Sequence, residues 1–600
     1  MHDSQPRRNQ RRSRPRILSL AAIAGLLVAL MPAAATAQTD PREGLGSGFL
    51  DAEQAIFGMD LIGTFEKPDG ELWDPASLDS AFGGISTANS DLTFTGDYAL
   101  QGNFAGFNIF DISDPANPTL RTVVHCPGGQ GDLNVWGDLV FMSVEETRAQ
   151  LDCTAGPSSG ENPNRFRGVR IFDISDIDNP QQVATVQTCR GSHTHRLVPD
   201  LNDPSRIYVY VNGTSSVRSG DELEGCANPP ATAEDFDEAS SRFRIEVIEV
   251  PLANPAAAEI VNEPRLFADD EGNIDGLWPG GSHGPGTQNT TQTDACHDIT
   301  VFPEIGLAAG ACEGNGLLLD ISDPANPKRI DEVIDPSFAY WHSANFNNDG
   351  TAVMFTDEWG GGTAARCREG DPATWGANGL YEIVRTADGP RLQFASHYKL
   401  PAAQTAAENC VAHQANVVPV PGRDIMVQAW YQGGISVFDW TDPSAPFEIA
   451  YFDRGPIADT LVLGGFWSGY WHNGNVYGTE IARGLDVFDL VETQYLSANE
   501  LAAAKTVTYD QHNPMTQSKV TWRLTAVVAD ALRDQADRAE LPANLRRDLD
   551  KFLDRALRFD SGAQGRAATA QLHALANQIE HQSDASALAK ALRGIADARG

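Results

Sequence analysis

Short alternations of apolar and polar residues run through the middle of the chain, and each is stopped by a cluster of Asp, Pro and Asn. A period-two alternation bounded by turn residues is typical of a half-buried strand. One such unit, "FDISDPANP" at 110–118, returns as "FDISDIDNP" at 172–180, "LDISDPANP" at 319–327 and "FDWTDPSAP" at 438–446. Weaker copies lie at 248–255, 381–390 and 488–490. The acidic position of the seven copies is held by Asp111, Asp173, Glu249, Asp320, Glu382, Asp439 and Asp489.

Each copy predicts the same local structure. The Asp-Pro and Asn-Pro steps end a strand, because proline lacks an N–H and biases the residue before it away from helix. Two apolar stretches precede each copy and another follows it, which gives four short strands per unit. Seven such units predict a mainly β protein, a seven-bladed β-propeller spanning 59–493.

The last copy, "GLDVFDL", has no strand after it, whereas "MDLIGTFEKP" at 59–68 is a strand without a unit. We therefore expect the N-terminal strand to complete the seventh blade and close the ring, since closure removes an exposed sheet edge. Residues 38–58 form an N-terminal extension before it.

The segments "GFNIFDISDPANP", "GVRIFDISDIDNP", "GLLLDISDPANP" and "GISVFDWTDPSAP" resemble the LVIVD-repeat family of exported or surface propellers. The resemblance covers about 59–493, with four good copies and three degenerate ones. It implies the propeller and a surface location, but no reaction, because a fold does not fix a function.

Beyond residue 494 the periodicity becomes helical, with apolar positions three and four residues apart from Val520 to Ile595. We expect a linker at 494–517, the first place for limited proteolysis to cut, and a three- or four-helix module at 518–600. The module resembles the FIMAH domain, a helical appendage of exported bacterial proteins. It is interpreted as a helical cap or docking module.

The first 37 residues have the pattern of an export signal. Six arginines precede an apolar run from Ile17 to Met31, and "ATA" at 35–37 is a small-residue cleavage site. The run is too short for a comfortable membrane span, and no later run reaches 18 apolar residues. We expect a secreted, extracellular or cell-surface protein, periplasmic if the cell has an outer membrane.

Eight cysteines fit that compartment, because an even number in an exported chain favours disulfides over metal thiolates. Pairing of neighbours in sequence order would tie each insertion to an adjacent strand, although the sequence alone does not fix connectivity. The expected pairs are Cys126–Cys153, Cys189–Cys226, Cys296–Cys312 and Cys367–Cys410.

The formal net charge is −37, and the acidic residues gather in the predicted propeller. Such a surface repels nucleic acid and anionic lipid, so we expect neither as a partner. An extracellular ligand or protein of unknown identity remains as the expected partner.

A histidine recurs at one offset at the start of the first strand of several units. Alignment of the seven units on this position gives Ser90, Gly131, His193, His297, His342, His413 and His472. Since the first strand of a blade lines the central channel, five imidazoles are predicted to converge at one rim. His195, two residues beyond His193, would face the same side but lie deeper.

Carboxylates follow the second strands and return to the same rim. They are Glu145, Glu146, Glu313, Asp357, Glu358 and Glu480. The polar insertions 147–167, 214–242, 269–294 and 359–376 are predicted to cover this rim, and long insertions in a compact repeat are often functional.

Two interpretations stay open. Neutral imidazoles with nearby carboxylates suit Cu, Fe or Zn, whereas a repeated histidine can equally bond the next blade and lock the ring. No GxSxG, HExxH, P-loop or Rossmann fingerprint stands in the required context. We expect an extracellular recognition or interaction scaffold; the alternative is a metal-dependent oxidoreductase or hydrolase with a histidine-ring site.

Overall fold

A computed structural model describes residues 40–67, 88–229, 239–269, 273–274, 276–387, 389–583 and 585–599. The predicted signal peptide lies outside the described residues. Residues Pro41–Gly600 form one compact unit.

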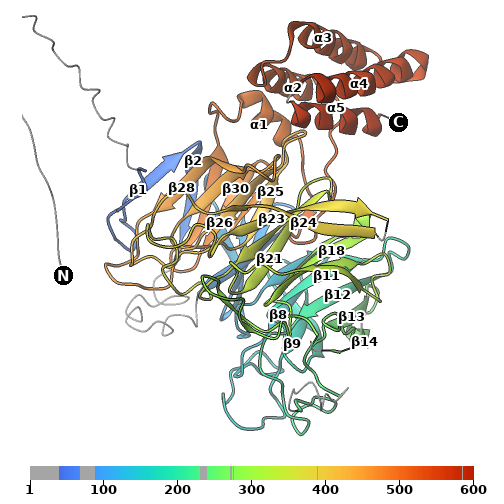
Figure 1. The fold of residues 1–600 in the computed structure, drawn as a ribbon. Coiled ribbons are helices and arrows are strands. Elements are labelled where there is room, and N and C mark those ends of the chain that lie inside the picture. The colour runs from blue at the N-terminus through green and yellow to red at the C-terminus, as the bar shows by residue number, and fades with distance from the viewer. Residues whose placement is uncertain are drawn as a thin grey trace, which may run out of the picture. The chain divides into compact units, whose positions relative to one another are not determined.

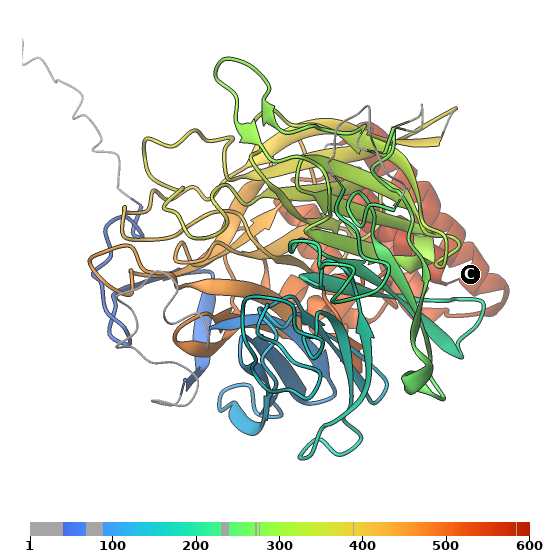
Figure 2. The same cartoon turned by 90° about the horizontal axis from the view of Figure 1, so that it is seen from below.

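Seven antiparallel sheets make up a seven-bladed propeller, and Figure 2 shows how they follow one another around a common centre. The strands of blades one to four are β3 (Asn89–Thr95), β4 (Tyr98–Asn103), β5 (Gly106–Asp111), β6 (Thr119–His125); β7 (Leu133–Trp136), β8 (Leu139–Val144), β9 (Gly168–Asp173), β10 (Gln181–Gln187); β11 (Thr194–Pro199), β12 (Arg206–Asn212), β13 (Glu246–Pro251), β14 (Glu259–Asn262); β17 (Asp298–Phe302), β18 (Leu307–Cys312), β19 (Asn315–Asp320) and β20 (Lys328–Val333). Those of blades five to seven are β21 (Trp341–Phe346), β22 (Ala352–Asp357), β23 (Asn378–Thr386), β24 (Gly389–Tyr398); β25 (Ala415–Val418), β26 (Ile425–Ala429), β27 (Ile435–Asp439), β28 (Phe447–Arg454); β29 (Phe466–His472), β30 (Asn475–Glu480), β31 (Gly484–Leu490) and β2 (Met59–Glu66).

The repeated acidic residue forms the turn after the third strand. In blade one, Asp111 Oδ1 accepts a hydrogen bond from the Ser113 N–H at 3.0 Å and from the Ser113 hydroxyl at 2.6 Å. Asp320 does the same for Ser322, at 2.9 and 2.6 Å. The side chain thus satisfies backbone groups that the ended strand leaves free.

Every blade has a register shift between its third and fourth strands, as at Ile109/Phe110 in blade one and Val437/Phe438 in blade six. In blade seven the fourth strand is β2, paired with β31, and the shift falls between Leu61 and Gly63. A β-bulge strengthens the local twist of a sheet. The N-terminal strand therefore carries the same irregularity as the fourth strands of the other blades.

Two sheets have a fifth strand that the sequence pattern did not predict. β1 (Gln54–Phe57), from the N-terminal extension, pairs with β28, and β32 (Gln511–His512) pairs with the inner strand β3. Two short strands, β15 (Gly281–Ser282) and β16 (Asn289–Thr290), form a hairpin in the 269–294 insertion. Single 3-10 turns lie at Pro255–Ala257 and Pro303–Ile305.

The segment around β32 crosses the inner strands of several blades at the ends opposite the histidines. Asn513 receives the Val135 N–H at 2.7 Å and donates to the Val135 carbonyl at 2.8 Å. Gln517 bonds the N–H and carbonyl of Phe346 in the same way, at 2.7 and 3.0 Å. Between them, the Met515 carbonyl accepts from the Val301 N–H at 2.9 Å. The stretch expected as part of a linker is thus folded against blades one, two, four and five; we call residues 510–517 the channel segment.

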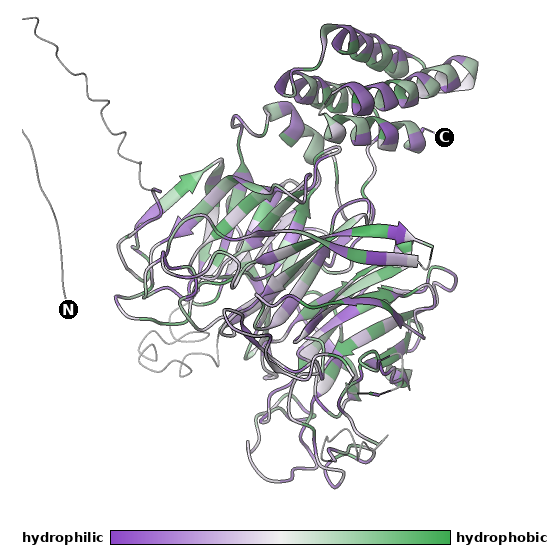
Figure 3. Ribbon diagram, in the orientation of Figure 1, coloured by the Kyte–Doolittle hydropathy of each residue, from purple (hydrophilic) through white to green (hydrophobic). Residues whose placement is uncertain are grey.

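Five α-helices follow the propeller: α1 (Ala498–Ala504), α2 (Ala526–Arg538), α3 (Ala543–Arg558), α4 (Gly562–Gln582) and α5 (Ser586–Ala598). The last four share one apolar core, which includes Leu532, Leu549, Leu572 and Leu592, and Figure 1 labels them near the C-terminus. Figure 3 shows that hydrophilic and hydrophobic residues alternate along these helices. None of the described helices combines the length and apolar character needed to cross a membrane.

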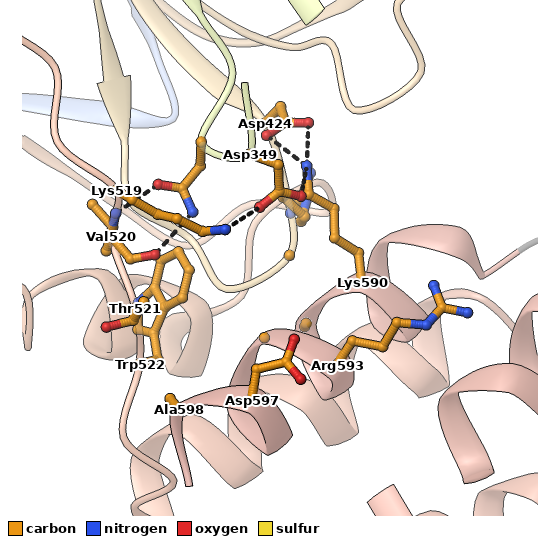
Figure 4. A pocket seen from close by; sticks show the side chains of 15 residues that line it. Asp349, Asp424, Lys519, Val520, Thr521, Trp522, Lys590, Arg593, Asp597 and Ala598 are labelled. Atoms are coloured by element: carbon orange, nitrogen blue, oxygen red, sulfur yellow. Dashed lines mark hydrogen bonds and ion pairs between the residues drawn. The ribbon is translucent and has the colours of Figure 1, made fainter. Parts of the chain in front are cut away.

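Charged groups join this module to the propeller. Lys590 of α5 lies 2.8 Å from Asp424 and 3.0 Å from Asp349, in a pocket that Figure 4 shows between the module and two propeller loops. Lys519 also faces Asp349, at 4.0 Å. Because these groups neutralise one another, we interpret this pocket as a contact between the helical module and the propeller rather than as a ligand site.

All four expected disulfides are confirmed: Cys126–Cys153, Cys189–Cys226, Cys296–Cys312 and Cys367–Cys410. No cysteine is free. Cys153, Cys226 and Cys367 lie in insertions and are bridged to loop residues next to strands, whereas Cys296 precedes β17 and is bridged to the last residue of β18.

Candidate metal centre

Four histidines meet at the starts of four consecutive inner strands. His193 and His297 immediately precede β11 and β17, His342 is the second residue of β21, and His413 lies two residues before β25. Neighbouring rings lie 4.2 Å (193 to 297), 4.0 Å (297 to 342) and 4.3 Å (342 to 413) apart between centroids. All four side chains are buried. Positions within two residues of the start of adjacent inner strands thus place four imidazoles side by side.

The Nδ1 atom of each ring is held by a fixed partner. His297 Nδ1 lies 3.0 Å from the His342 carbonyl, and His413 Nδ1 bonds the Trp467 carbonyl. His193 Nδ1 lies 2.8 Å from Glu145 Oε2, and His342 Nδ1 lies 3.3 Å from the Thr356 hydroxyl. A carbonyl can only accept, so Nδ1 of His297 and His413 carries the proton. The neutral ring then has its lone pair on Nε2.

The Nε2 atoms face one another and one carboxylate. His193 Nε2 lies 2.6 Å from His297 Nε2, which is a hydrogen-bond distance. Glu358 follows β22 and reaches both other rings, with Oε2 at 3.9 Å from His342 Nε2 and Oε1 at 3.9 Å from His413 Nε2. One ligand atom from each of His297, His342 and Glu358 lies within 4.8 Å of the other two. Small side-chain rotations would therefore bring these three groups to one cation.

Glu358 is itself fixed by Tyr431, whose hydroxyl donates to Oε1 at 2.6 Å. The adjacent loop reaches Tyr431 because Gly362 has φ of +66° and no side chain. A Cβ at this position would lie 2.2 Å from the Tyr431 hydroxyl oxygen. Only glycine fits such a close approach in a left-handed conformation.

The electrostatics favour neutral rings at His297, His342 and His413. Burial, followed by the neighbouring histidines, lowers the pKa of His297 and of His342 well below its usual range. Burial lowers the pKa of His413 to about 3. Burial opposes charge on His193 as well, but Glu145 outweighs it and raises the pKa of that ring. Burial raises the pKa of Glu358 to about 7.

His472 does not join the four, so the expectation of five converging rings is wrong at this residue. It is the last residue of β29, at the end near the channel segment, where it stacks on Phe94 with centroids 4.3 Å apart and on His512 at 5.6 Å. The "YWH" of 470–472 repeats that of 340–342 in letters only, because β29 starts earlier relative to it. Trp467, the second residue of β29, lies beside the centre instead.

The other predicted residues divide into two groups. Glu145 and Glu358 contact the histidines, and Glu313 lies one step behind them, 3.5 Å from the Tyr340 hydroxyl. Burial, then Asp294, raises the pKa of Glu313 to about 8. Three residues are turned away from the centre and hold other groups.

Asp357 accepts the N–H groups of Ala339, Tyr340 and Gly376. Glu480 accepts those of Gly465 and Ala482, each at 2.8 Å. His195, predicted to face the same side as His193, points instead toward blade two, 2.8 Å from the Ser143 hydroxyl. These three are therefore structural in their contacts.

Above the histidines lies a pocket of about 530 Å³. Its floor includes His193, His297, His342 and His413, and its walls include Phe104, Tyr340, Tyr431 and Trp467. Of the four insertions expected to cover it, 269–294 contributes Asn289 and Thr291, and 359–376 contributes Gly360, Gly361 and Thr363. The described parts of 147–167 and 214–242 do not line it.

The aromatic walls were not predicted from the sequence. Tyr340 stands two residues before His342, and Tyr431 and Trp467 come from loops or strand starts without a repeated pattern. Two aromatic residues stand directly before a rim histidine in "YWH" at 340–342. That was the only sequence signal that could have placed Tyr340 beside the site.

Comparison with known proteins gives a fold but no activity. A family model described as the LVIVD repeat matches residues 88–125. No curated protein sequence matches the chain. A periplasmic gluconolactonase from Pseudomonas aeruginosa is similar in structure, with 13% identity, a TM-score of 0.41, and coverage of 65% of this chain and 88% of that one.

Two further solved structures are similar at the same level. A putative 6-phosphogluconolactonase from Bacteroides uniformis has 11% identity and a TM-score of 0.39, and covers 65% of this chain and 89% of its own. Hydrazine synthase from Kuenenia stuttgartiensis has 11% identity and a TM-score of 0.38, with coverage of 66% and 92%. At these identities and TM-scores, the likenesses carry no conclusion about this chain.

Proposed function

We propose that this protein is a metal-binding propeller whose channel mouth holds one first-row transition ion. His297, His342 and Glu358 would be the primary ligands, with His413 and His193 at the open side. The observation that carries the proposal is the orientation of the rings. In each imidazole, Nδ1 contacts a hydrogen-bonding partner and Nε2 faces the common centre.

This arrangement matches the general build of histidine metal sites, in which the second ring nitrogen is bonded to a carbonyl or carboxylate that fixes the tautomer. A lock between blades would need only the Nδ1 bonds. It would not explain why the Nε2 atoms of His342 and His413 both face Glu358, whose carboxylate oxygens lie 3.9 Å from each. Imidazole with one carboxylate suits Zn²⁺, Cu²⁺ or Fe²⁺.

The test is metal titration of the chelator-treated full chain with Zn²⁺, followed by calorimetry. We expect one ion per chain and, in His342→Ala, an affinity weaker by more than about 100-fold, since even supporting residues of such sites are worth 10- to 100-fold. His125→Ala removes an exposed imidazole of β6 and His472→Ala removes a buried one outside the centre. Both should bind as the unchanged protein does.

Equal Zn²⁺ affinity in His342→Ala and the unchanged protein would refute the metal site. The recognition-scaffold role expected from the sequence would then stand. That role predicts lower thermal stability in His342→Ala and no specific ion.

We also infer export to the cell surface or periplasm and closure of the ring by β2. The four disulfides support export, since such bonds persist in oxidising compartments. The bulged pairing of β2 with β31 supports closure. The C-terminal helices, which resemble a FIMAH domain, are proposed as a docking module.

A further inference from the structure

The pocket above the histidines has walls of a particular chemistry. Trp467 packs edge-on against His413, with centroids 5.1 Å apart, and Tyr431 lies 4.5 Å from the same ring. Phe104, Leu463 and Trp467 belong to one apolar cluster with Tyr431 and are each only partly buried. Apolar side chains thus lie directly beside His413 and remain partly exposed to the pocket.

The charged residues in and around the pocket restrict the class of ligand that it could bind. Among its described lining residues there is no Lys or Arg, and the one carboxylate is Glu358. Behind the lining, Arg190 and Arg242 both bond Asp294. Arg366 lies beside Gly360 and stacks on Trp359. The chain as a whole has a formal charge of −37. A phosphorylated or polycarboxylate ligand would therefore meet no Lys or Arg side chain among the described lining residues.

The opposite wall is polar but uncharged. Asn289 and Thr291, from the hairpin insertion, line it, and Gly360 and Gly361 leave the rim low because they carry no side chain. A volume of about 530 Å³ suits a small molecule rather than a polymer. The pocket thus offers a flat apolar wall, a metal at its floor and a few neutral polar groups.

We propose that the pocket binds a small, uncharged aromatic molecule that presents one N or O donor to the metal and lays its ring against Trp467 and Phe104. This proposal rests on the metal site above, because the donor needs the ion. Aromatic pairs of this kind contribute about 0.5–1.5 kcal/mol beyond burial of their area.

The experiment uses the full chain loaded with Co²⁺, whose visible spectrum changes when a new ligand enters its coordination shell. Benzimidazole is titrated against imidazole, which has the same donor without the second ring. We expect benzimidazole to bind about 3- to 10-fold more tightly, the range that an aromatic contact supplies. The preference should vanish in Trp467→Ala and shrink in Phe104→Ala.

Trp375→Ala is the matched control, since Trp375 belongs to the 359–376 insertion but does not line the pocket; it should keep the preference. The Trp467→Ala and Phe104→Ala variants are both measured, so that misfolding of one of them does not decide the result. Phenyl phosphate, an aromatic dianion, should not displace benzimidazole at equal concentration.

Failure of Co²⁺ to bind would contradict the metal site itself. Binding of Co²⁺ with no preference for benzimidazole, or a preference unchanged in both wall variants, would overturn only the ligand proposal. Displacement by phenyl phosphate would overturn its uncharged character.

Discussion

Single side chains decide which groups of this propeller face the channel and which hold the backbone. Glu358 and Asp357 are adjacent, yet Glu358 points to the histidines while Asp357 accepts three backbone N–H groups. Successive residues at a strand end point to opposite sides. One of the two is therefore available for chemistry and the other for structure.

Glu500 is a residue of the second kind whose loss should be felt strongly. It lies fully buried in α1, caps that helix together with Ser497, and bonds Arg423 of the propeller at 3.0 Å and Arg538 of α2. Since removal of one partner leaves buried charge uncompensated, Glu500→Gln should lower the free energy of unfolding by about 3–5 kcal/mol. Urea denaturation measures this.

The pH dependence follows from the same contacts. Burial alone would raise the pKa of Glu500, but Arg538 and Arg423 outweigh burial and lower it. The stabilisation is thus complete above the ordinary glutamate pKa and is lost as the pH falls through the lowered one. Glu500→Gln should flatten this part of the stability profile, whereas exposed Glu492→Gln should leave it unchanged; equal profiles in all three proteins would contradict the assignment.

At this scale the sequence predicted the rim position of His193, His297, His342 and His413 because each stands within two residues of the start of its inner strand. It failed at His472 because the letters "YWH" repeat without the strand register repeating. The direction of Glu480 was not predictable either. Its oxygens accept the N–H groups of Gly465, in the loop before β29, and of Ala482, in the turn between β30 and β31.

Among the elements, the channel segment differs most from what the sequence predicted. Its side chains make the hydrogen bonds that a neighbouring strand would make. Asn513 bonds both the N–H and the carbonyl of Val135 and accepts a hydrogen bond from the Thr93 hydroxyl at 2.6 Å. An inner strand has no neighbour on its channel side, so its inward backbone groups need partners of this sort. The segment supplies them at the end opposite the metal centre.

Asn513→Ala should therefore destabilise the propeller by about 2–4 kcal/mol, because a buried N–H and a buried carbonyl lose their partners at about 1–3 kcal/mol each. Thermal and urea unfolding of the full chain test this. Asn202→Ala, in an exposed loop, is the control and should change stability by less than about 0.5 kcal/mol.

A loss no larger in Asn513→Ala than in Asn202→Ala would show that the channel segment is only loosely held. In that case the sequence-based expectation of a protease-sensitive linker at 494–517 would be restored. Protease cleavage within 510–517 before any loss of propeller structure would have the same meaning.

The blades themselves were predictable, because the Asp-centred turn and the strand alternation repeat in the sequence. The channel segment was not. "DQHNPMTQ" has neither strand nor helix periodicity, and its conformation comes from amide side chains that match strand ends far away in the chain. β1 was missed for a similar reason, since its partner β28 is about 400 residues later.

In the whole molecule, covalent and packing constraints converge on the histidine rim. Cys296 precedes His297 directly, Cys410 lies three residues before His413, and Cys189 four before His193. Each of these cysteines is bridged. Disulfides limit the freedom of the chain they close. The strand starts that carry the imidazoles are thus fixed before any ligand arrives, which is the preorganisation that a binding site requires.

The central claim is that these imidazoles share one ion, and metal-edge X-ray absorption of the full chain loaded with one equivalent of Zn²⁺ tests it most directly. The account predicts a four- or five-coordinate shell of N and O at about 2.0–2.2 Å, with the outer-shell scattering of at least two imidazole rings, reduced by one ring in His342→Ala. A shell of oxygen atoms without imidazole scattering, or one unaltered in His342→Ala, would contradict it.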